Sequence, residues 1–295
     1  ASRSGALARE SSAAAEWEAV RASGAAALVH TCDASEPAHV RRLVARSPSL
    51  AGVWHAAGVL ADGVLPKQTA AALARVYAPK AHGAEALRLA SARSPLRSCV
   101  LFSSVSALLG GSGQANYSAA NACLDALARC RRAHGGASAS VQWGAWAEVG
   151  MAARGAASER MAAMEAASGF GRIGLAHGLA ALAAAVRPCG AAAVCVMPVV
   201  WSRALGGGKA AAPGFLSAFA PKVAGPRGTA PPSAASCALS LEAVLEMVRR
   251  TAGGGSVDAD APLMEAGVDS LGAVELRNQL QGAAGEGVAL SSTLV

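Results

Sequence analysis

The sequence predicts a three-layer α/β fold, in which helices cover both faces of a parallel sheet, followed by a partial helical bundle. Short β-branched apolar runs alternate with longer Ala- and Leu-rich stretches as far as about Trp201. That alternation is typical of parallel strands joined by crossover helices. A segment rich in Gly, Ala and Pro begins at Gly206, and helical periodicity resumes only after it. The chain therefore divides into a sheet domain, a linker and a helical region.

Five apolar runs are the expected strands, and each follows a stretch of helical pattern. They are residues 26–32 (AALVHTC), 52–58 (GVWHAAG), 98–104 (SCVLFSS), 139–146 (ASVQWGAW) and 192–200 (AAVCVMPVV). In the helical region, residues 239–251 and 269–280 have the spacing of amphipathic helices. We expect the first domain to span 1–219, the linker 220–238 and the helical domain 239–295.

Composition excludes several classes of protein. A chain with 53% hydrophobic and 15% charged residues is too apolar for disorder. Its seven cysteines are scattered without a C-x-x-C pair and the histidines do not cluster with them, so we expect a reducing, cytoplasmic compartment and no structural metal. The longest apolar tract, Leu175 to Val200, contains Arg187 and Pro188, which predicts a helix and a buried strand rather than a membrane span. We expect no membrane association and no signal peptide.

Charge is unevenly distributed along the chain. Residues 239–295 hold three basic residues against eight acidic ones, whereas residues 1–238 hold 23 basic against 11 acidic. The basic residues are mostly single arginines without aromatic interleaving, a pattern that disfavours nucleic-acid binding. We expect arginines that face an acidic partner domain. The chain also begins with Ala and stops without a closing helix, so we expect a piece of a longer polypeptide, truncated at both ends.

One stretch, residues 100–127, carries the candidate catalytic groups. Ser104 ends an apolar strand, Tyr117 opens a helix one Gly-rich loop later, and Asn121 lies one helical turn further on the same face. Because ligands of parallel sheets bind at the carboxyl ends of the strands, both hydroxyls are expected in one crevice. Upstream, Lys80 lies in a second helical stretch.

This set suits the reduction of a ketone by hydride transfer. A phenol can protonate the developing alkoxide at neutral pH if a nearby cation lowers its pKa, which is the expected role of Lys80. Ser104 would donate a hydrogen bond to the carbonyl oxygen, and Asn121 would hold Lys80 or a water molecule. Taken singly, Ser104 is also compatible with a turn cap and Tyr117 with simple packing.

These residues resemble the ketoreductase of modular polyketide synthases, a branch of the short-chain dehydrogenase family with a Rossmann-like fold. In ordinary short-chain dehydrogenases a Lys follows the Tyr by four residues, whereas Asn121 stands there in this chain and Lys80 looks like the relocated cation. The resemblance runs from residue 1 to about Phe219. It implies NADPH-dependent reduction of a β-ketoacyl thioester, bound to a carrier domain, to a β-hydroxyacyl thioester.

The resemblance also implies the cofactor contacts. His55, Ala56, Ala57 and Gly58 look like the motif that lines the cofactor, and Asp33 with Ala34 like the adenine contact, although a strand-end turn and a helix cap are compatible with them as well. Ser2 and Arg3 resemble the residues that meet the 2′-phosphate of NADPH, which favours NADPH over NADH. No G-x-G-x-x-G precedes them, so we expect these 295 residues alone to bind NADPH poorly.

Residues 263–280 (LMEAGVDSLGAVELRNQL) resemble the signature of an acyl carrier domain. This implies that Ser270 carries 4′-phosphopantetheine, attached by a phosphopantetheinyl transferase. A helix N-terminus suits a phosphodiester, although Ser270 is also compatible with a plain N-cap. Further partners would be the other domains of the same synthase.

The resemblance also bears on stereochemistry. The subtype that gives a 3R alcohol is marked by Leu-Asp-Asp after the cofactor-lining turn, and here the triplet is Leu60, Ala61 and Asp62. Leu109 stands where the opposite subtype has a Trp, so Asp62 predicts a 3R product, although a turn cap would also explain it. Two other functions stay open: a catalytically silent carrier and scaffold region, or a free-standing short-chain dehydrogenase that acts on a diffusible ketone.

Overall fold

The structure is a computed structural model that describes residues 12–149, 169–187, 190–205, 213–220 and 240–252, together with short stretches between 257 and 283. Three of the predicted binding residues, Ser2, Arg3 and Ser270, lie outside the described residues.

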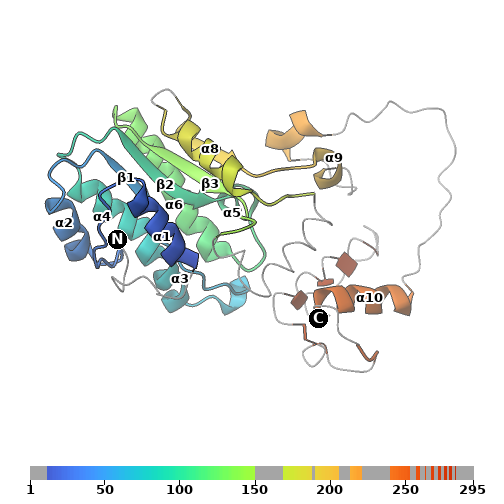
Figure 1. The fold of residues 1–295 in the computed structure, drawn as a ribbon. Coiled ribbons are helices and arrows are strands. Elements are labelled where there is room, and N and C mark those ends of the chain that lie inside the picture. The colour runs from blue at the N-terminus through green and yellow to red at the C-terminus, as the bar shows by residue number, and fades with distance from the viewer. Residues whose placement is uncertain are drawn as a thin grey trace.

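Four parallel strands form one sheet in the order β1-β2-β3-β4 (Figure 1). Their bounds are Gly52–His55 for β1, Ser98–Ser104 for β2, Ala139–Trp143 for β3 and Ala193–Val196 for β4. The parallel α/β sheet predicted from the alternating pattern is thereby confirmed. Since all strands run in one direction, their carboxyl ends, including Ser104, meet at one edge of the sheet.

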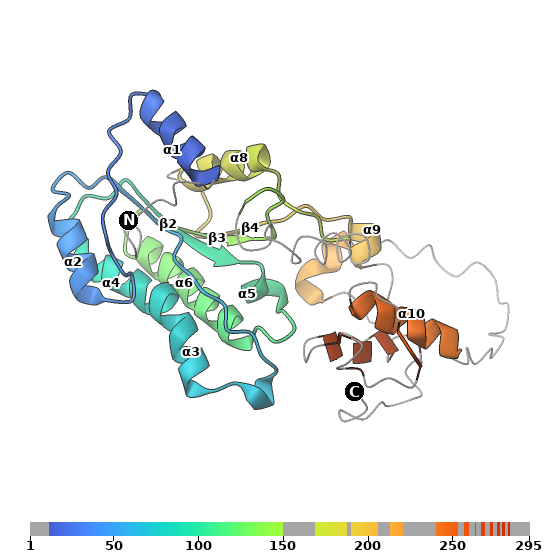
Figure 2. The same cartoon turned by 60° about the horizontal axis from the view of Figure 1, so that its bottom comes forward.

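The helices of the sheet domain have these bounds: α1 Ser12–Ala22, α2 Pro37–Ala45, α3 Ala70–Tyr77, α4 Gly83–Ala90, α5 Ser106–Leu109, α6 Ala115–Ala133, α8 Leu175–Ala185 and α9 Trp201–Ala204. Single turns are η1 at Leu65–Lys67, η2 at Ala78–His82 and η4 at Gly214–Phe219. Figure 2 shows α4 and α6 on one side of the sheet and α8 on the other.

The two faces of the sheet are covered by different apolar clusters. On one face, Leu101 of β2 packs with Leu124 and Ala128 of α6. On the other face, Val100 and Trp143 pack with α8. Successive residues of a strand point to opposite faces, so Val100 and Leu101 contribute to different clusters. The expected three-layer arrangement follows from this alternation.

Two of the strand predictions need correction. Residues 26–32 are extended but make only an isolated bridge, at Thr31, and Leu28 is 78% exposed. A strand needs a neighbour to pair with, and within the described residues β1 pairs only with β2. The last strand, β4, was expected to be buried, but it is half-buried because it forms the other edge of the sheet.

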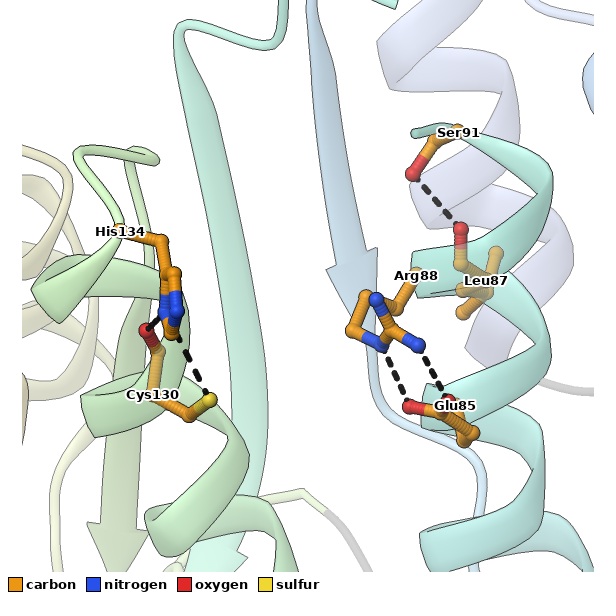
Figure 3. Close-up of polar contacts among 6 residues, drawn as sticks. All are labelled: Glu85, Leu87, Arg88, Ser91, Cys130 and His134. Atoms are coloured by element: carbon orange, nitrogen blue, oxygen red, sulfur yellow. Dashed lines mark hydrogen bonds and ion pairs between the residues drawn. The ribbon is translucent and has the colours of Figure 1, made fainter. Parts of the chain in front are cut away.

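The far ends of α4 and α6 are held by local polar contacts (Figure 3). Arg88 donates two hydrogen bonds of 2.6 Å to the Glu85 carboxylate, and the Ser91 hydroxyl donates to the Leu87 carbonyl. At the end of α6, His134 Nδ1 lies 2.7 Å from the Cys130 carbonyl oxygen. The Ser91 and His134 contacts satisfy backbone carbonyls that a helix end leaves without a partner.

The second region contains α10, Leu241–Thr251, in the place predicted for a helix. Ser240 caps it, because its hydroxyl oxygen accepts a hydrogen bond of 3.2 Å from the Ala243 amide. Val248 packs with Val257, Val268 and Leu276 into a small buried cluster. This region therefore has an apolar core of its own.

Three general findings concern the described residues. None of their helices is both long and apolar enough to cross a membrane. They contain no group of three or more His, Cys, Asp or Glu side chains that could hold a metal ion. Five of the cysteines are free thiols, namely Cys32, Cys99, Cys123, Cys130 and Cys195.

Candidate active site

Tyr117 and Asn121 lie on the buried side of α6, one turn apart. Tyr117 is in the first turn of the helix, and Ser104 is the last residue of β2, so both reach the carboxyl edge of the sheet. The Asn121 side-chain amide donates a hydrogen bond of 2.8 Å to the Tyr117 carbonyl oxygen. The predicted common face is confirmed by this contact.

Lys80 reaches the same place from a helical run formed by α3, η2 and α4. Its turn, η2, is a π turn that contains Pro79, and Pro cannot donate the usual helical hydrogen bond. The Lys80 side chain is only 4% exposed. Its Nζ donates a hydrogen bond of 3.0 Å to the Phe102 carbonyl oxygen and lies 5.1 Å from the centre of the Tyr117 ring. The structure therefore brings a buried amine to the predicted phenol.

Two residues of the predicted cofactor motif hold Lys80 in place. His55 is buried, and its Nε2 lies 3.1 Å from the Lys80 carbonyl oxygen. Burial lowers the pKa of His55, so its ring is neutral and can donate to that oxygen. A side chain on Gly58 would meet Lys80 Cε at 2.9 Å. The buried His55 side chain therefore supports the Lys80 turn, and its place in a motif that lines the cofactor stays a prediction.

Burial controls the ionisation of the site. It lowers the pKa of Lys80 to about 8, and the negative charge of Asp125 opposes this shift. Burial also raises the pKa of the Tyr117 phenol, against the opposing effect of hydrogen bonding by Asn121 and Ser104. The expectation that Lys80 lowers the pKa of Tyr117 below its ordinary value is therefore not met, since desolvation of the buried phenolate dominates.

The two remaining predicted groups have more local partners than expected. The Ser104 hydroxyl oxygen accepts a hydrogen bond of 3.2 Å from the Ser106 amide, which is the turn-cap role, and its own proton stays available to donate. Asn121 bonds to the α6 backbone, and its buried Oδ1 has no hydrogen-bond partner within the described part of the chain. The structure thus has no Asn121 bond to Lys80, while it leaves a buried acceptor beside Tyr117.

Three hydrogen bonds join the segment after Gly58 to the loop before Tyr117. The Gly63 amide donates to the Gly113 carbonyl oxygen at 2.8 Å, and Asn116 Nδ2 donates to the Ala61 carbonyl oxygen at 2.8 Å. Gln114 Nε2 donates to an Asp62 carboxylate oxygen at 3.0 Å. Sequence reasoning singled out Asp62 but missed Gln114 and Asn116, because loop-to-loop pairing across 50 residues has no local pattern.

The other predicted cofactor residues form surface turns. Ala56 is exposed and Ala57 and Gly58 are half-buried directly after β1, beside the carboxyl end of β2. Asp33 accepts a hydrogen bond of 2.9 Å from the Ser35 amide, the turn-capping contact that the sequence left open. Ala34 packs closely against Gly83 at the start of α4.

Comparison with known proteins assigns both regions. Residues 1–148 match the family model of the KR domain, and residues 242–294 match the model of the phosphopantetheine attachment site. A polyketide synthase of Streptomyces halstedii, GfsB, is 40% identical over 306 residues, which cover 93% of this chain and 5% of that protein. The phthioceranic/hydroxyphthioceranic acid synthase of Mycobacterium tuberculosis H37Rv is 36% identical over 284 residues, which cover 90% of this chain and 13% of the synthase. The chain thus spans a small part of the curated relatives it matches.

Solved structures give the same result. The ketoreductase from the first module of phoslactomycin biosynthesis in Streptomyces sp. HK803 has a TM-score of 0.65 and 33% identity, over 75% of this chain and 50% of that chain. A C2-type ketoreductase from a modular polyketide synthase has a TM-score of 0.61 and 37% identity, over 72% and 46% of the two chains. The chain belongs to the ketoreductase (KR) domain family of polyketide synthases and continues into a phosphopantetheine-attachment domain.

Proposed function

We propose that residues 1–219 reduce a β-ketoacyl thioester, carried on phosphopantetheine, to a β-hydroxyacyl thioester with NADPH, as part of a polyketide synthase. The observation that carries the proposal is the buried pair of Lys80 and Tyr117, with Nζ 5.1 Å from the ring centre at the carboxyl edge of the sheet. A buried amine beside a buried phenol is costly to the fold, and perturbed groups of this kind gather at functional sites.

Tyr117 is the proton donor in this proposal. Its raised pKa keeps the phenol protonated at neutral pH, so the proton is present before the reaction begins. NADPH, when bound, supplies the hydride to the ketone carbon. As negative charge grows on the substrate oxygen, Ser104 donates a hydrogen bond to it and Tyr117 transfers its phenolic proton. The phenolate that remains is stabilised by the Lys80 ammonium group, whose pKa of about 8 keeps it mostly charged at neutral pH.

In this proposal, the turn after β1 holds the nicotinamide half of the cofactor. Ala56, Ala57 and Gly58 supply a small turn without bulky side chains at the carboxyl end of β1. On the adenine side, Asp33 and Ala34 remain the proposed contacts, and Ser2 with Arg3 the proposed 2′-phosphate contacts. A guanidinium at that place distinguishes NADPH from NADH by charge.

The carrier region has the proposed boundaries 239–295, after a linker at 220–238. Support comes from the start of α10 at Leu241 and from the end of the sheet domain, where Phe219 stacks on Trp201 with ring centres 4.4 Å apart. Ser270 is the proposed attachment residue for phosphopantetheine, supplied by a phosphopantetheinyl transferase. The other proposed partners are the remaining domains of the synthase, in the cytoplasm.

The proposed product is the 3R alcohol. Asp62 is tied to Gln114 and thereby to the loop before Tyr117, so it is in a position to shape one side of the substrate entry. The opposite faces of the ketone require entry of the pantetheine arm from opposite sides. Ketoreductases labelled A-type and C2-type are both among the similar structures, so that likeness does not single out a subtype.

A synthase polypeptide that includes these residues and its carrier domain would test the function. We expect NADPH consumption with a β-ketoacyl thioester surrogate, and formation of the β-hydroxyacyl thioester by mass spectrometry. NADPH binding without turnover would favour the silent scaffold instead. Preference for a free ketone over the thioester would favour a free-standing dehydrogenase.

A further inference from the structure

We propose that Asp125 is a positioning residue of the reductase site: its buried carboxylate fixes α6 against β3 and places a negative charge on the helical face that also carries Tyr117 and Asn121. The inference deepens the proposed function, because it rests on the roles of Lys80 and Tyr117 stated above.

The anchoring half of the proposal rests on the geometry of α6. Asp125 follows Tyr117 and Asn121 at four-residue intervals, so the three side chains lie on one helical face. Asp125 is 3% exposed. One carboxylate oxygen accepts a hydrogen bond of 2.6 Å from Ser140 Oγ, and the other accepts one of 2.7 Å from Gln142 Nε2. Two bonds to alternate residues of β3 fix the helix that carries the phenol along the strand.

The charge half rests on what surrounds the carboxylate. Ser140 and Gln142 are neutral donors, so they orient the carboxylate without cancelling its charge. A charge in a dry interior acts over a longer range than one at the surface. The Asp125 charge affects two titratable groups. Burial lowers the pKa of Lys80, and the Asp125 charge opposes this shift. Burial raises the pKa of the Cys195 thiol on β4, and the Asp125 charge raises it further.

Among the groups that the structure describes around Lys80, Asp125 is the source of compensating charge. His55 on β1 is neutral through burial, and the Tyr117 phenol on α6 is neutral because its pKa is raised. The Phe102 carbonyl of β2 offers one uncharged acceptor. Asp125 is the carboxylate whose charge opposes the loss of the Lys80 proton. Without it, less of Lys80 would be charged at neutral pH.

The chain is suited to a direct test because it has only four lysines, Lys67, Lys80, Lys209 and Lys222. The 295-residue chain would be labelled with lysine carrying 13C at Cε, and the shifts followed by NMR from pH 6 to pH 11. The Lys80 signal is identified by its absence from the Lys80→Met chain. In the native chain its midpoint should lie near 8.

Asp125→Asn keeps the shape of the side chain and removes its charge. We expect the Lys80 midpoint to fall by about one pH unit in this variant. Glu36→Gln, which removes one charge from an exposed side chain at the start of α2, should leave the midpoint unchanged. Ser140→Ala keeps the carboxylate and removes one anchor, so it should lower the thermal midpoint of unfolding while the Lys80 midpoint stays in place.

Two results would overturn the proposal. The charge role is refuted if the Lys80 midpoint in folded Asp125→Asn equals the midpoint in Glu36→Gln. The anchoring role is refuted if Ser140→Ala is as stable as the native chain. If circular dichroism shows Asp125→Asn unfolded, the anchoring role is supported and Asp125→Glu decides the other. This variant keeps the charge, so its Lys80 midpoint should stay near 8, and a clearly lower midpoint in the folded variant would remove the charge role. The Lys80 midpoint and the unfolding midpoint are measured without turnover. Failure of the proposed reduction would appear separately, as absent NADPH consumption in the native synthase.

Discussion

Replacement of Lys80 by Met should stabilise the fold while it removes the proposed function. The pKa of Lys80 is lowered from 10.5 to about 8 by burial, so the charged form costs the folded state about 3 kcal/mol at pH 7 relative to the unfolded chain. Met has a similar length and carries no charge. Loss of the Nζ hydrogen bond to Phe102 offsets part of the gain by about 1–2 kcal/mol. A net increase of about 1–2 kcal/mol in the free energy of unfolding should remain.

The pH dependence of this difference is the sharper part of the prediction. Because the folded pKa lies below the unfolded one, the unfolded chain binds more protons between about pH 8 and pH 10.5. The free energy of unfolding of the native chain therefore rises across this window, relative to that of Lys80→Met. The advantage of the Met variant should be present at pH 7 and shrink or reverse by pH 10.

Urea unfolding of both chains at pH 7 and pH 10, followed by circular dichroism, measures this difference. Groups remote from Lys80 titrate equally in both chains, so their contributions cancel in the comparison. A Met variant that is less stable than the native chain at pH 7, or a difference that does not change with pH, would refute the account of a costly buried ammonium group.

Three further predictions concern the glycine turn, the carrier and the product. Gly58→Ala should lower NADPH turnover about tenfold or more, because the added methyl carbon would lie 2.9 Å from Lys80 Cε and displace that side chain. Gly214→Ala, whose added carbon meets nothing within 4 Å, should leave turnover unchanged. Equal rates in the two variants would contradict the packing argument. A phosphopantetheinyl transferase with coenzyme A should add one phosphopantetheine to a chain extended through a complete carrier bundle, as seen by intact mass, and an adduct that survives Ser270→Ala would place the arm elsewhere. Chiral chromatography of the β-hydroxyacyl thioester should give the 3R alcohol, and predominance of 3S alcohol would overturn the role proposed for Asp62.

Sequence reasoning was accurate where a local pattern has one physical meaning. The run SCVLFSS is β2 residue for residue, because β-branched and aromatic side chains between turns favour a buried strand. The spacing of Tyr117 and Asn121 correctly predicted a common face, since the helical period is fixed. Lys80 was predicted as the nearby cation from its place in a second helical stretch, and the structure brings its Nζ to within 5.1 Å of the centre of the Tyr117 ring.

What could not be predicted depends on contacts between distant segments. Residues 26–32 have the composition of a strand, but composition does not say whether a neighbour is available to pair with. The contact between His55 and the Lys80 carbonyl was missed as well, because the two residues lie 25 positions apart in the chain. The predicted direction of the Tyr117 pKa shift was wrong for a similar reason: the depth of burial, which outweighs the hydrogen bonds of Asn121 and Ser104, is a tertiary property.

The most direct test of the account is single-turnover reduction by Tyr117→Phe in a synthase polypeptide that includes these residues. Phe keeps the ring that packs beside Lys80 and removes only the hydroxyl group, so NADPH binding, measured by fluorescence, should stay within about twofold of the native value. Reduction of the β-ketoacyl thioester should fall by a factor of at least about 100, because a general acid contributes 10²–10⁴-fold. A variant that binds NADPH and reduces the thioester at a rate close to that of the native protein would contradict the assignment of Tyr117 as the proton donor.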